Sequence, residues 1–108
     1  MTDIEMTKSS GNVFADLDLA NPEERAAKSD IASKIAQIIE KRHLSQTEAA
    51  KLLGIAQPKV SLILNGRLGG FSLEKLLLLM VALDRDIEIR IKKKPRSREH
   101  AHLQVVYV

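Results

Sequence analysis

The sequence predicts a mainly α-helical domain with a short β-strand near its C-terminus, on three observations. Over residues 22–83, apolar side chains recur three and four positions apart, which is the spacing of one helix face. The hydrophobic share of 44% is largely aliphatic, because aromatic residues make up only 3% of the chain, and alanine and leucine favour helices. Over residues 86–92, apolar and charged residues alternate strictly, as they do in a half-buried strand. We therefore expect a compact helical bundle with a C-terminal strand extension.

The chain has 108 residues, which is enough for one domain with a short appendage and too few for two. We divide it into an N-terminal arm at 1–20, a helical domain at 21–84 and a basic strand and tail at 85–108. Cysteine is absent, which excludes disulfides, thiol catalysis and thiolate zinc sites and is compatible with a reducing cytoplasm. No export signal and no apolar run of roughly 18 residues is present, so we expect a cytoplasmic protein with no membrane partner.

Charge is distributed unevenly, although the net charge is only +3. Residues 1–24 hold six acidic side chains and one lysine, a balance of −5. Residues 85–98 hold seven basic side chains and two acidic ones, a balance of +5. A basic segment suits contact with phosphates, because each neutralised phosphate releases counterions. A merely solvated tail explains this run equally well.

The expected N-terminal arm leads into a long helix. The first dozen residues are polar and aperiodic, so we expect disorder there, followed by a short extended segment at Val13–Leu19. Asn21 is a helix cap, and Pro22 with two following glutamates suits a first turn. The helix should run from Pro22 to about Arg42 as one piece, although Ser29-Asp30 could recap and split it. Its apolar stripe comprises Ala27, Ile31, Ile35, Ile38 and Ile39.

A second and a third helix are predicted between Ser45 and Arg67. Ser45 and Glu48 form a capping box, in which hydroxyl and carboxylate each accept from an otherwise unpaired N–H at a helix start. Gly54 can adopt the left-handed conformation that ends this helix. Pro58 fits only the first turn of a new helix, which makes Gln57 its expected cap. The apolar face of that helix comprises Val60, Ile63 and Leu64. The turn at Asn65-Gly66 ends it.

The last predicted helix, Leu73–Leu83, begins at the cap Ser72 and is apolar on more than one side. One core stripe needs only Leu73, Leu76, Leu77, Met80 and Leu83. Leu78, Leu79 and Val81 are then surplus. A helix that is apolar all round is buried on several sides, which indicates a partner surface. The alternative is that the C-terminal segment of the same chain folds over it.

The predicted strand, Asp86–Lys92, places three isoleucines on one face and charged side chains on the other. A lone strand has unpaired backbone groups and must find a neighbour. Candidates are the segment at 13–19, the terminal segment at 103–108, and the same strand of a second subunit. The expected dimer or partner surface comprises Leu78, Leu79, Val81, Ile87, Ile89 and Ile91.

No catalytic chemistry is indicated. His100 and His102 lie two residues apart beside Glu99, but two imidazoles in an exposed linker make a poor metal site. The glycines before Ser72 lack the lysine of a phosphate-binding loop. No serine, histidine and aspartate form a recognisable nucleophile setting. We expect a protein that is not an enzyme and needs no cofactor or metal.

The segment Ser45–Arg67 resembles the helix-turn-helix of the Xre/Cro family of bacterial and phage repressors. Counting from Gln46, the family pattern has a small residue at the fifth position, glycine at the ninth, and aliphatic residues at the fifteenth and eighteenth. The residues found there are Ala50, Gly54, Val60 and Ile63. The pattern has a packing reason, because the helices cross closely, turn sharply and are held by aliphatic side chains in the core.

This resemblance implies that the second helix of the motif lies in the major groove, where its first residues contact base edges. Gln57 is the best candidate, since its amide can pair bidentately with adenine. Pro58 and Leu62 stand where relatives are commonly polar, and could contact thymine methyl groups. The expected base-contacting residues are Gln57, Pro58, Lys59, Ser61 and Leu62. The expected phosphate-contacting residues are Gln46, Thr47, Lys51, Asn65 and Arg67.

A longer resemblance, over about residues 12–95, is to Xre-type antitoxins of the HigA kind. It comprises an NVFADL-like segment, a helix opened by PEE, the AAKLLGIAQPKVSLILNGR core, GFSLEKLL and the basic DIEIRIKK strand. It implies a homodimer that represses its own operon at a palindromic double-stranded operator and neutralises a small toxin that cleaves translated mRNA. A basic toxin would suit the acidic segment at 1–24. The alternative is a stand-alone Xre-type repressor with no toxin partner.

Overall fold

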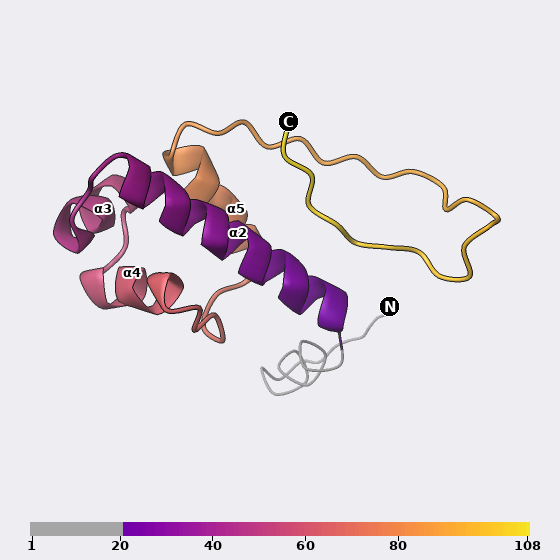
Figure 1. The fold of residues 1–108 in the computed structure, drawn as a ribbon, viewed down its shortest axis with the longest axis horizontal. Helices are drawn as coiled ribbons and strands as arrows, with labels where there is room; N and C mark the ends of the chain where they lie inside the picture. Colours follow the sequence, from indigo (N-terminus) through magenta and orange to yellow (C-terminus); the bar gives the residue numbers. More distant parts are fainter. Residues whose placement is uncertain (1–20) are drawn as a thin grey trace.

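The computed structural model describes residues 21–108, so the expectations for the N-terminal arm, including the extended segment at 13–19, lie outside the described residues. Its helices are α2 (Pro22–Lys41), α3 (Gln46–Leu53), α4 (Gln57–Leu64) and α5 (Leu73–Ala82). Figure 1 shows α2 as the long axis of the bundle, with α3 and α4 near its C-terminal end. Within residues 21–108, no helix is both long and apolar enough to cross a membrane.

α2 is one continuous helix, as predicted. The side chain of Asn21 caps it by accepting a hydrogen bond from the N–H of Glu24 at 3.1 Å, and Glu23 and Glu24 lie at the positive end of its dipole. The helix passes through Ser29-Asp30 without interruption. It ends where His43 adopts a left-handed conformation with φ of 58°. Local capping therefore defines both ends of the helix.

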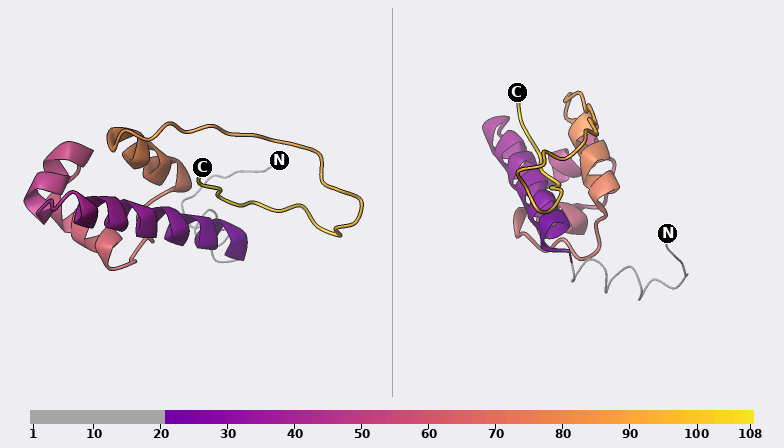
Figure 2. Two further views of the ribbon diagram at one scale, coloured as in Figure 1. Left: turned by 45° about the horizontal axis from the view of Figure 1, so that its top comes forward. Right: turned by 90° about the vertical axis from the view of Figure 1, so that its right-hand side faces the viewer.

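The core lies where α2 and α3 meet α4 and α5, since each of the first two helices contacts each of the last two. Two views in Figure 2 show the helices enclosing this region from different sides. The buried cluster is aliphatic apart from Phe71 and Met80, in keeping with the low aromatic content. Its largest fully buried side chains are Ile31, Ile35, Leu76, Leu79, Leu83 and Val60.

The predicted orientation of α5 was wrong at Leu79. This side chain is only 2% exposed and belongs to the core, whereas Leu78 and Val81 are 56% and 50% exposed. Leu73 and Leu77, expected in the core, are only partly buried. A run of consecutive apolar residues is compatible with several helix rotations, so contact with α2 and α3 decides which row faces inward. The surplus apolar surface of α5 is reduced to Leu78 and Val81.

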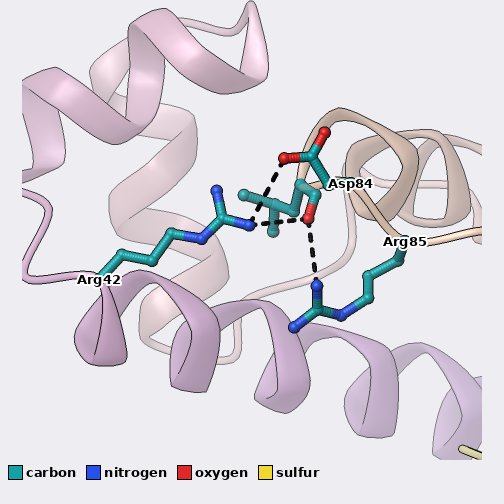
Figure 3. Close-up of polar contacts among 4 residues, drawn as sticks. Arg42, Asp84 and Arg85 are labelled. Atoms are coloured by element: carbon teal, nitrogen blue, oxygen red, sulfur yellow. Dashed lines mark hydrogen bonds and ion pairs between the residues drawn. The ribbon is translucent and has the colours of Figure 1, made fainter.

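The C-terminal ends of α2 and α5 are joined by polar contacts on one carbonyl, drawn in Figure 3. Nη2 of Arg42 donates to the carbonyl oxygen of Leu83 at 3.0 Å, and Nη1 of Arg85 approaches the same oxygen at 3.5 Å. Arg42 also lies 3.8 Å from a carboxylate oxygen of the exposed Asp84. Cations at a helix C-terminus satisfy its unpaired carbonyls and oppose the negative end of its dipole. This contact fixes where α5 ends relative to α2.

The predicted strand at 86–92 is not formed. The segment is extended, but no backbone hydrogen bond within residues 21–108 joins it to another segment. Ile87, Ile89 and Ile91 are all exposed. Alternation predicted a half-buried strand, but a strand also requires a neighbour to pair with, and residues 21–108 supply none.

The terminal segment packs on α2 instead of covering α5. Figure 1 shows the chain leaving α5 as a long loop and returning toward α2. The backbone N–H of Leu103 donates to a carboxylate oxygen of Glu23 at 3.4 Å, and the Tyr107 hydroxyl donates to the carbonyl of Asp30 at 3.3 Å. Burial, and secondarily the charge of Asp30, raises the pKa of Tyr107 above 10.0. Nζ of Lys34 lies 5.4 Å from the tyrosine ring centroid. Within residues 21–108, no segment therefore covers Leu78 and Val81 on the exposed face of α5.

Exchanging Leu79 for alanine should lower the free energy of unfolding by about 2 to 5 kcal/mol, because it leaves a cavity in a close-packed core. The matched variant Leu78→Ala should change it by less than about 0.5 kcal/mol, since that side chain already contacts solvent. Urea unfolding followed by circular dichroism measures both. A larger loss for Leu78→Ala than for Leu79→Ala would contradict the orientation of α5 found here.

Candidate nucleic-acid interface

α3 is held by the predicted capping box. The N–H of Glu48 donates to Oγ of Ser45 at 3.1 Å, and the N–H of Ser45 donates to Oε1 of Glu48 at 2.8 Å. The helix buries Ala49, Ala50 and Leu53. Small residues at this crossing let α3 and α4 approach closely, as the sequence pattern predicted. The caps and the buried face together fix the position of α3.

Gly54 makes the turn between α3 and α4. Its φ of 72° lies in the left-handed region, and its N–H donates to the carbonyl of Ala50 at 2.9 Å. No atom lies within 4 Å of the position that a Cβ would occupy there. Glycine is therefore favoured by the backbone conformation alone, and not by lack of space.

α4 begins one residue earlier than the sequence indicated. Its cap is Ala56, which offers no side-chain hydrogen bond, and Gln57 is the first helical residue. The prediction of Gln57 as the cap was therefore wrong. Pro58 is tolerated at the second helical position because N–H groups throughout the first turn lack intrahelical partners. The consequence is functional, since the Gln57 amide is not used to cap the helix.

Packing orients α4 so that the predicted base-contacting side faces solvent. Val60 is fully buried and Ile63 is 2% exposed. A period of 3.6 residues per turn places Pro58 and Leu62 on the side opposite those two. Of the expected base-contacting residues, Ser61 is partly buried. The other four are exposed, namely Gln57, Pro58, Lys59 and Leu62. The structure thus brings the expected set onto one accessible surface, with two apolar residues at its centre.

The expected phosphate-contacting residues lie on α3 and directly after α4. Thr47, Lys51 and Arg67 are exposed, and Gln46 is partly buried. Asn65 has a role that sequence reasoning missed, because its Nδ2 donates to the carbonyl of Ser61 at 2.9 Å. A polar side chain four residues after a serine was the available signal. Asn65 therefore fastens the end of α4, which reduces its freedom to donate to a phosphate.

The electrostatics of the surface suit an anion. From Ala49 to Leu73 the chain contains Lys51, Lys59 and Arg67 and no acidic residue. The first turn of α4 likewise carries no acid, so nothing on the helix itself opposes the positive end of its dipole. Pro58 has no N–H and the N–H of Lys59 donates to the carbonyl of Ala56 at 2.9 Å, so the positive potential at this helix start comes from the dipole and the nearby cations. Cations and dipole act together over one continuous segment.

Comparison with known proteins agrees with this geometry. The profile of a helix-turn-helix domain family matches residues 13–92. A solved structure named as an XRE family transcriptional regulator is 49% identical, with a TM-score of 0.77, over 81% of this chain and 98% of that chain. The chain belongs to the XRE helix-turn-helix family. It is accordingly a DNA-binding transcriptional regulator, and the predicted Xre-type helix-turn-helix is confirmed.

Two further results bear on this XRE helix-turn-helix protein. No curated protein matches the chain. In the part of the chain that the structure describes, residues 21–108, no group of three or more histidine, cysteine, aspartate or glutamate side chains is arranged to hold a metal ion. The family is one of transcription regulators, a class that is not typically enzymatic.

The exchange Gly54→Ala should lower the free energy of unfolding by about 1 kcal/mol, because alanine is strained at positive φ. Gly69→Ala is the matched control, since Gly69 has no positive φ and no atom within 4 Å of the added Cβ. It should leave stability unchanged or raise it by about 0.5 kcal/mol, through lower entropy of the unfolded chain. Thermal unfolding compares the two. Equal losses would show that the turn does not depend on the left-handed conformation.

Proposed function

We propose that this protein is a sequence-specific repressor that binds a palindromic operator as a homodimer, and that it is also the antitoxin of a toxin–antitoxin operon. The main support for DNA binding is the exposed side of α4, which carries no acidic residue. This side faces solvent because Val60 and Ile63 on the opposite side are buried in the core. Helix-turn-helix proteins place such a helix in the major groove.

Base contact is assigned to the start of α4. The Gln57 amide, free of any capping role, can pair bidentately with adenine. Lys59 can donate to guanine, while Pro58 and Leu62 suit thymine methyl groups. Ser61 is partly buried, and its carbonyl oxygen accepts a hydrogen bond from Nδ2 of Asn65. We therefore assign Ser61 a smaller part in base contact. Specificity from one subunit then depends largely on Gln57.

Backbone contact is assigned to residues that flank the motif. Gln46 and Thr47 lie at the N-terminus of α3, where free N–H groups and side chains can approach a phosphate. Arg67 follows α4 and is the strongest candidate, because its guanidinium can donate two hydrogen bonds to one phosphate. Lys51 adds charge. Asn65 is the weakest member, since its amide is engaged with α4.

A homodimer follows from the reach of a single recognition helix. One α4 contacts few bases, and two-fold proteins bind palindromes whose half-sites lie about one helical turn apart. Leu78 and Val81 on α5, and the three isoleucines of 86–92, are exposed apolar residues that fit an interface. Leu79, which the sequence placed in this surface, belongs to the core of its own subunit.

Substituting Gln57 by alanine should weaken operator binding by about 1 to 3 kcal/mol and relax discrimination at one base pair. Arg67→Ala should instead weaken binding to all sequences alike and lower the salt dependence by about one unit of slope. Gln37→Ala on the exposed surface of α2 is the matched control for amide removal and should change neither. Fluorescence anisotropy at several salt concentrations, with operator and random DNA, separates these outcomes.

Equal losses on operator and random DNA for Gln57→Ala would remove Gln57 from the base-contacting set. A loss confined to one base pair for Arg67→Ala would likewise contradict its assignment to phosphate. Neither result would question the fold, because both side chains are exposed and contribute nothing to the core.

Support for the antitoxin role comes from the negative charge of residues 1–24 and from the exposed apolar side chains of α5. Residues 1–24 carry six acidic side chains against one lysine. A toxin that acts on RNA must itself be basic, and opposite charge speeds and orients association. The competing site for such a toxin is the exposed apolar surface of α5 at Leu78 and Val81. The alternative, a repressor without a toxin, is supported by the DNA surface alone.

Removal of residues 1–20 should abolish toxin neutralisation and leave operator binding intact. The cut keeps Asn21, whose side chain caps α2, so the domain retains its first helix. A full-length variant with Asp3, Glu5, Asp16 and Asp18 changed to the corresponding amides is the matched control for charge. Both should fail to protect cells that express the neighbouring toxin, while gel shifts stay unchanged.

A truncated protein that still protects cells would rule out the N-terminal segment as the toxin-binding element. Protection by the amide variant but not by the truncated one would assign recognition to contacts other than charge. The absence of an adjoining reading frame for a small basic protein would contradict the antitoxin role itself. The repressor role would be unaffected.

A further inference from the structure

Residues 86–92 expose three isoleucines to solvent, and their backbone is not paired with any other segment within residues 21–108. The exposed fraction of the isoleucine side chains rises outward along the segment, from 38% at Ile87 to 74% at Ile89 and 94% at Ile91. The backbone groups of the segment make no hydrogen bond to another segment within residues 21–108. An unpaired extended segment of this kind is a template for pairing with another chain.

The charge pattern of this segment is self-complementary in the antiparallel direction. When two copies are aligned antiparallel with Ile89 opposite Ile89, Asp86 faces Lys92 and Glu88 faces Arg90. Each of these pairings occurs twice, because a two-fold axis relates the copies. Ile87 faces Ile91 on the other side of the ribbon. Every charged residue thus meets the opposite charge, and every isoleucine meets an isoleucine.

Other registers lose this match. Moving the centre to Glu88 or Arg90 sets like charges opposite each other at the axis, and moving it to Ile91 sets Arg90 against Lys92. A shift that pairs isoleucine with charged residues puts apolar side chains on the wrong face. Parallel alignment in register opposes each charge with its own kind. Directly opposed like charges destabilise a strand pair.

We propose that residues 86–92 of two copies of this chain form an antiparallel two-stranded ribbon centred on Ile89. The proposal rests on the homodimer of the proposed function and specifies its interface. In the single chain, Nε of Arg90 lies 2.7 Å from a carboxylate oxygen of Glu88, and both side chains are largely exposed. In the ribbon, Glu88 and Arg90 can each also form an ion pair with the opposite residue of the second copy.

In the proposed dimer, the apolar face of the ribbon packs against α5. A two-stranded ribbon alone is marginal in water and needs packing against another element. α5 ends at Ala82, four residues before the segment, and carries Leu78 and Val81 three positions apart on one exposed face. The three isoleucines of each strand pack on these side chains. One interface then accounts for both sets of exposed apolar residues.

The other candidate partner for this segment within the described chain is the terminal segment at 103–108. That segment uses the backbone N–H of Leu103 and the hydroxyl of Tyr107 to contact α2. No backbone hydrogen bond joins it to residues 86–92. It also offers Gln104 as its one polar residue apart from Tyr107, and no acidic or basic side chain to match the charges. A second copy is the better fit.

Single cysteines test the register directly, because the native chain has none. Directly opposed residues of an antiparallel pair have Cα atoms about 4.5 to 5.5 Å apart, within the range of a disulfide. Ile89→Cys should therefore form a covalent dimer under mild oxidation. Ile87→Cys and Ile91→Cys should not, since each lies about 13 Å from its own copy. A one-to-one mixture of those two variants should cross-link.

Charge reversal supplies an independent test. Glu88→Arg and Arg90→Glu should each weaken the dimer by about tenfold or more, because each sets like charges opposite each other at two places. Mixing the two variants should restore dimerisation as a heterodimer, in which every pair is again opposite. Analytical ultracentrifugation of each variant and of the mixture measures this.

The outcomes separate this inference from the proposed function. A dimer by ultracentrifugation in which Ile89→Cys fails to cross-link, or cross-links no faster than Ile87→Cys, overturns the ribbon and leaves the homodimer standing. Failure of the mixed charge variants to associate overturns it as well. A native protein that is monomeric at micromolar concentration while binding its operator fully overturns both the homodimer and the ribbon.

Discussion

The burial of Val60 and Ile63 is the interaction on which the proposed DNA-binding surface depends. α4 has eight residues, which is too short for an isolated helix to be stable in water. Its stability and its rotation about its own axis must therefore come from packing against α2 and α3. Because these two aliphatic side chains point inward, Gln57 and Lys59 remain outside. Core packing and exposure of the contact residues have the same cause.

The helix starts show how local chemistry prepares this arrangement. Asn21, Ser45 and Ser72 each accept a hydrogen bond from an N–H in the first turn of α2, α3 and α5. Among the helix starts within residues 21–108, that of α4 lacks such a side chain. Pro58 has no N–H, and the N–H of Lys59 donates to the carbonyl of Ala56 at 2.9 Å, so the first turn of α4 is closed without a side-chain cap. The Gln57 amide is therefore left available for the base contact proposed for it.

Helix boundaries were largely predictable, because they depend on residues within a few positions of each end. Asn21, the Ser45–Glu48 box and Gly54 act as the sequence indicated. The start of α4 was missed by one residue, since Pro58 fits either of two adjacent positions in a first turn. The candidate contact residues were named from the motif, and they lie on α3, on α4 and just after α4. Their contact with DNA stays a prediction, and the engagement of Asn65 with Ser61 was overlooked.

By itself the sequence determined the helices α2 to α5, the caps at the starts of α2, α3 and α5, and the helix-turn-helix, because each follows from local spacing and backbone preference. Tertiary structure decided which side of α5 is buried, since a helix apolar on several sides carries no rotational information of its own. It also decided that residues 86–92 stay unpaired within the described chain and that Tyr107 packs on α2. Alternation specifies an extended backbone with two different faces. A sheet forms only when a second strand supplies the hydrogen bonds, and that condition lies outside the segment itself.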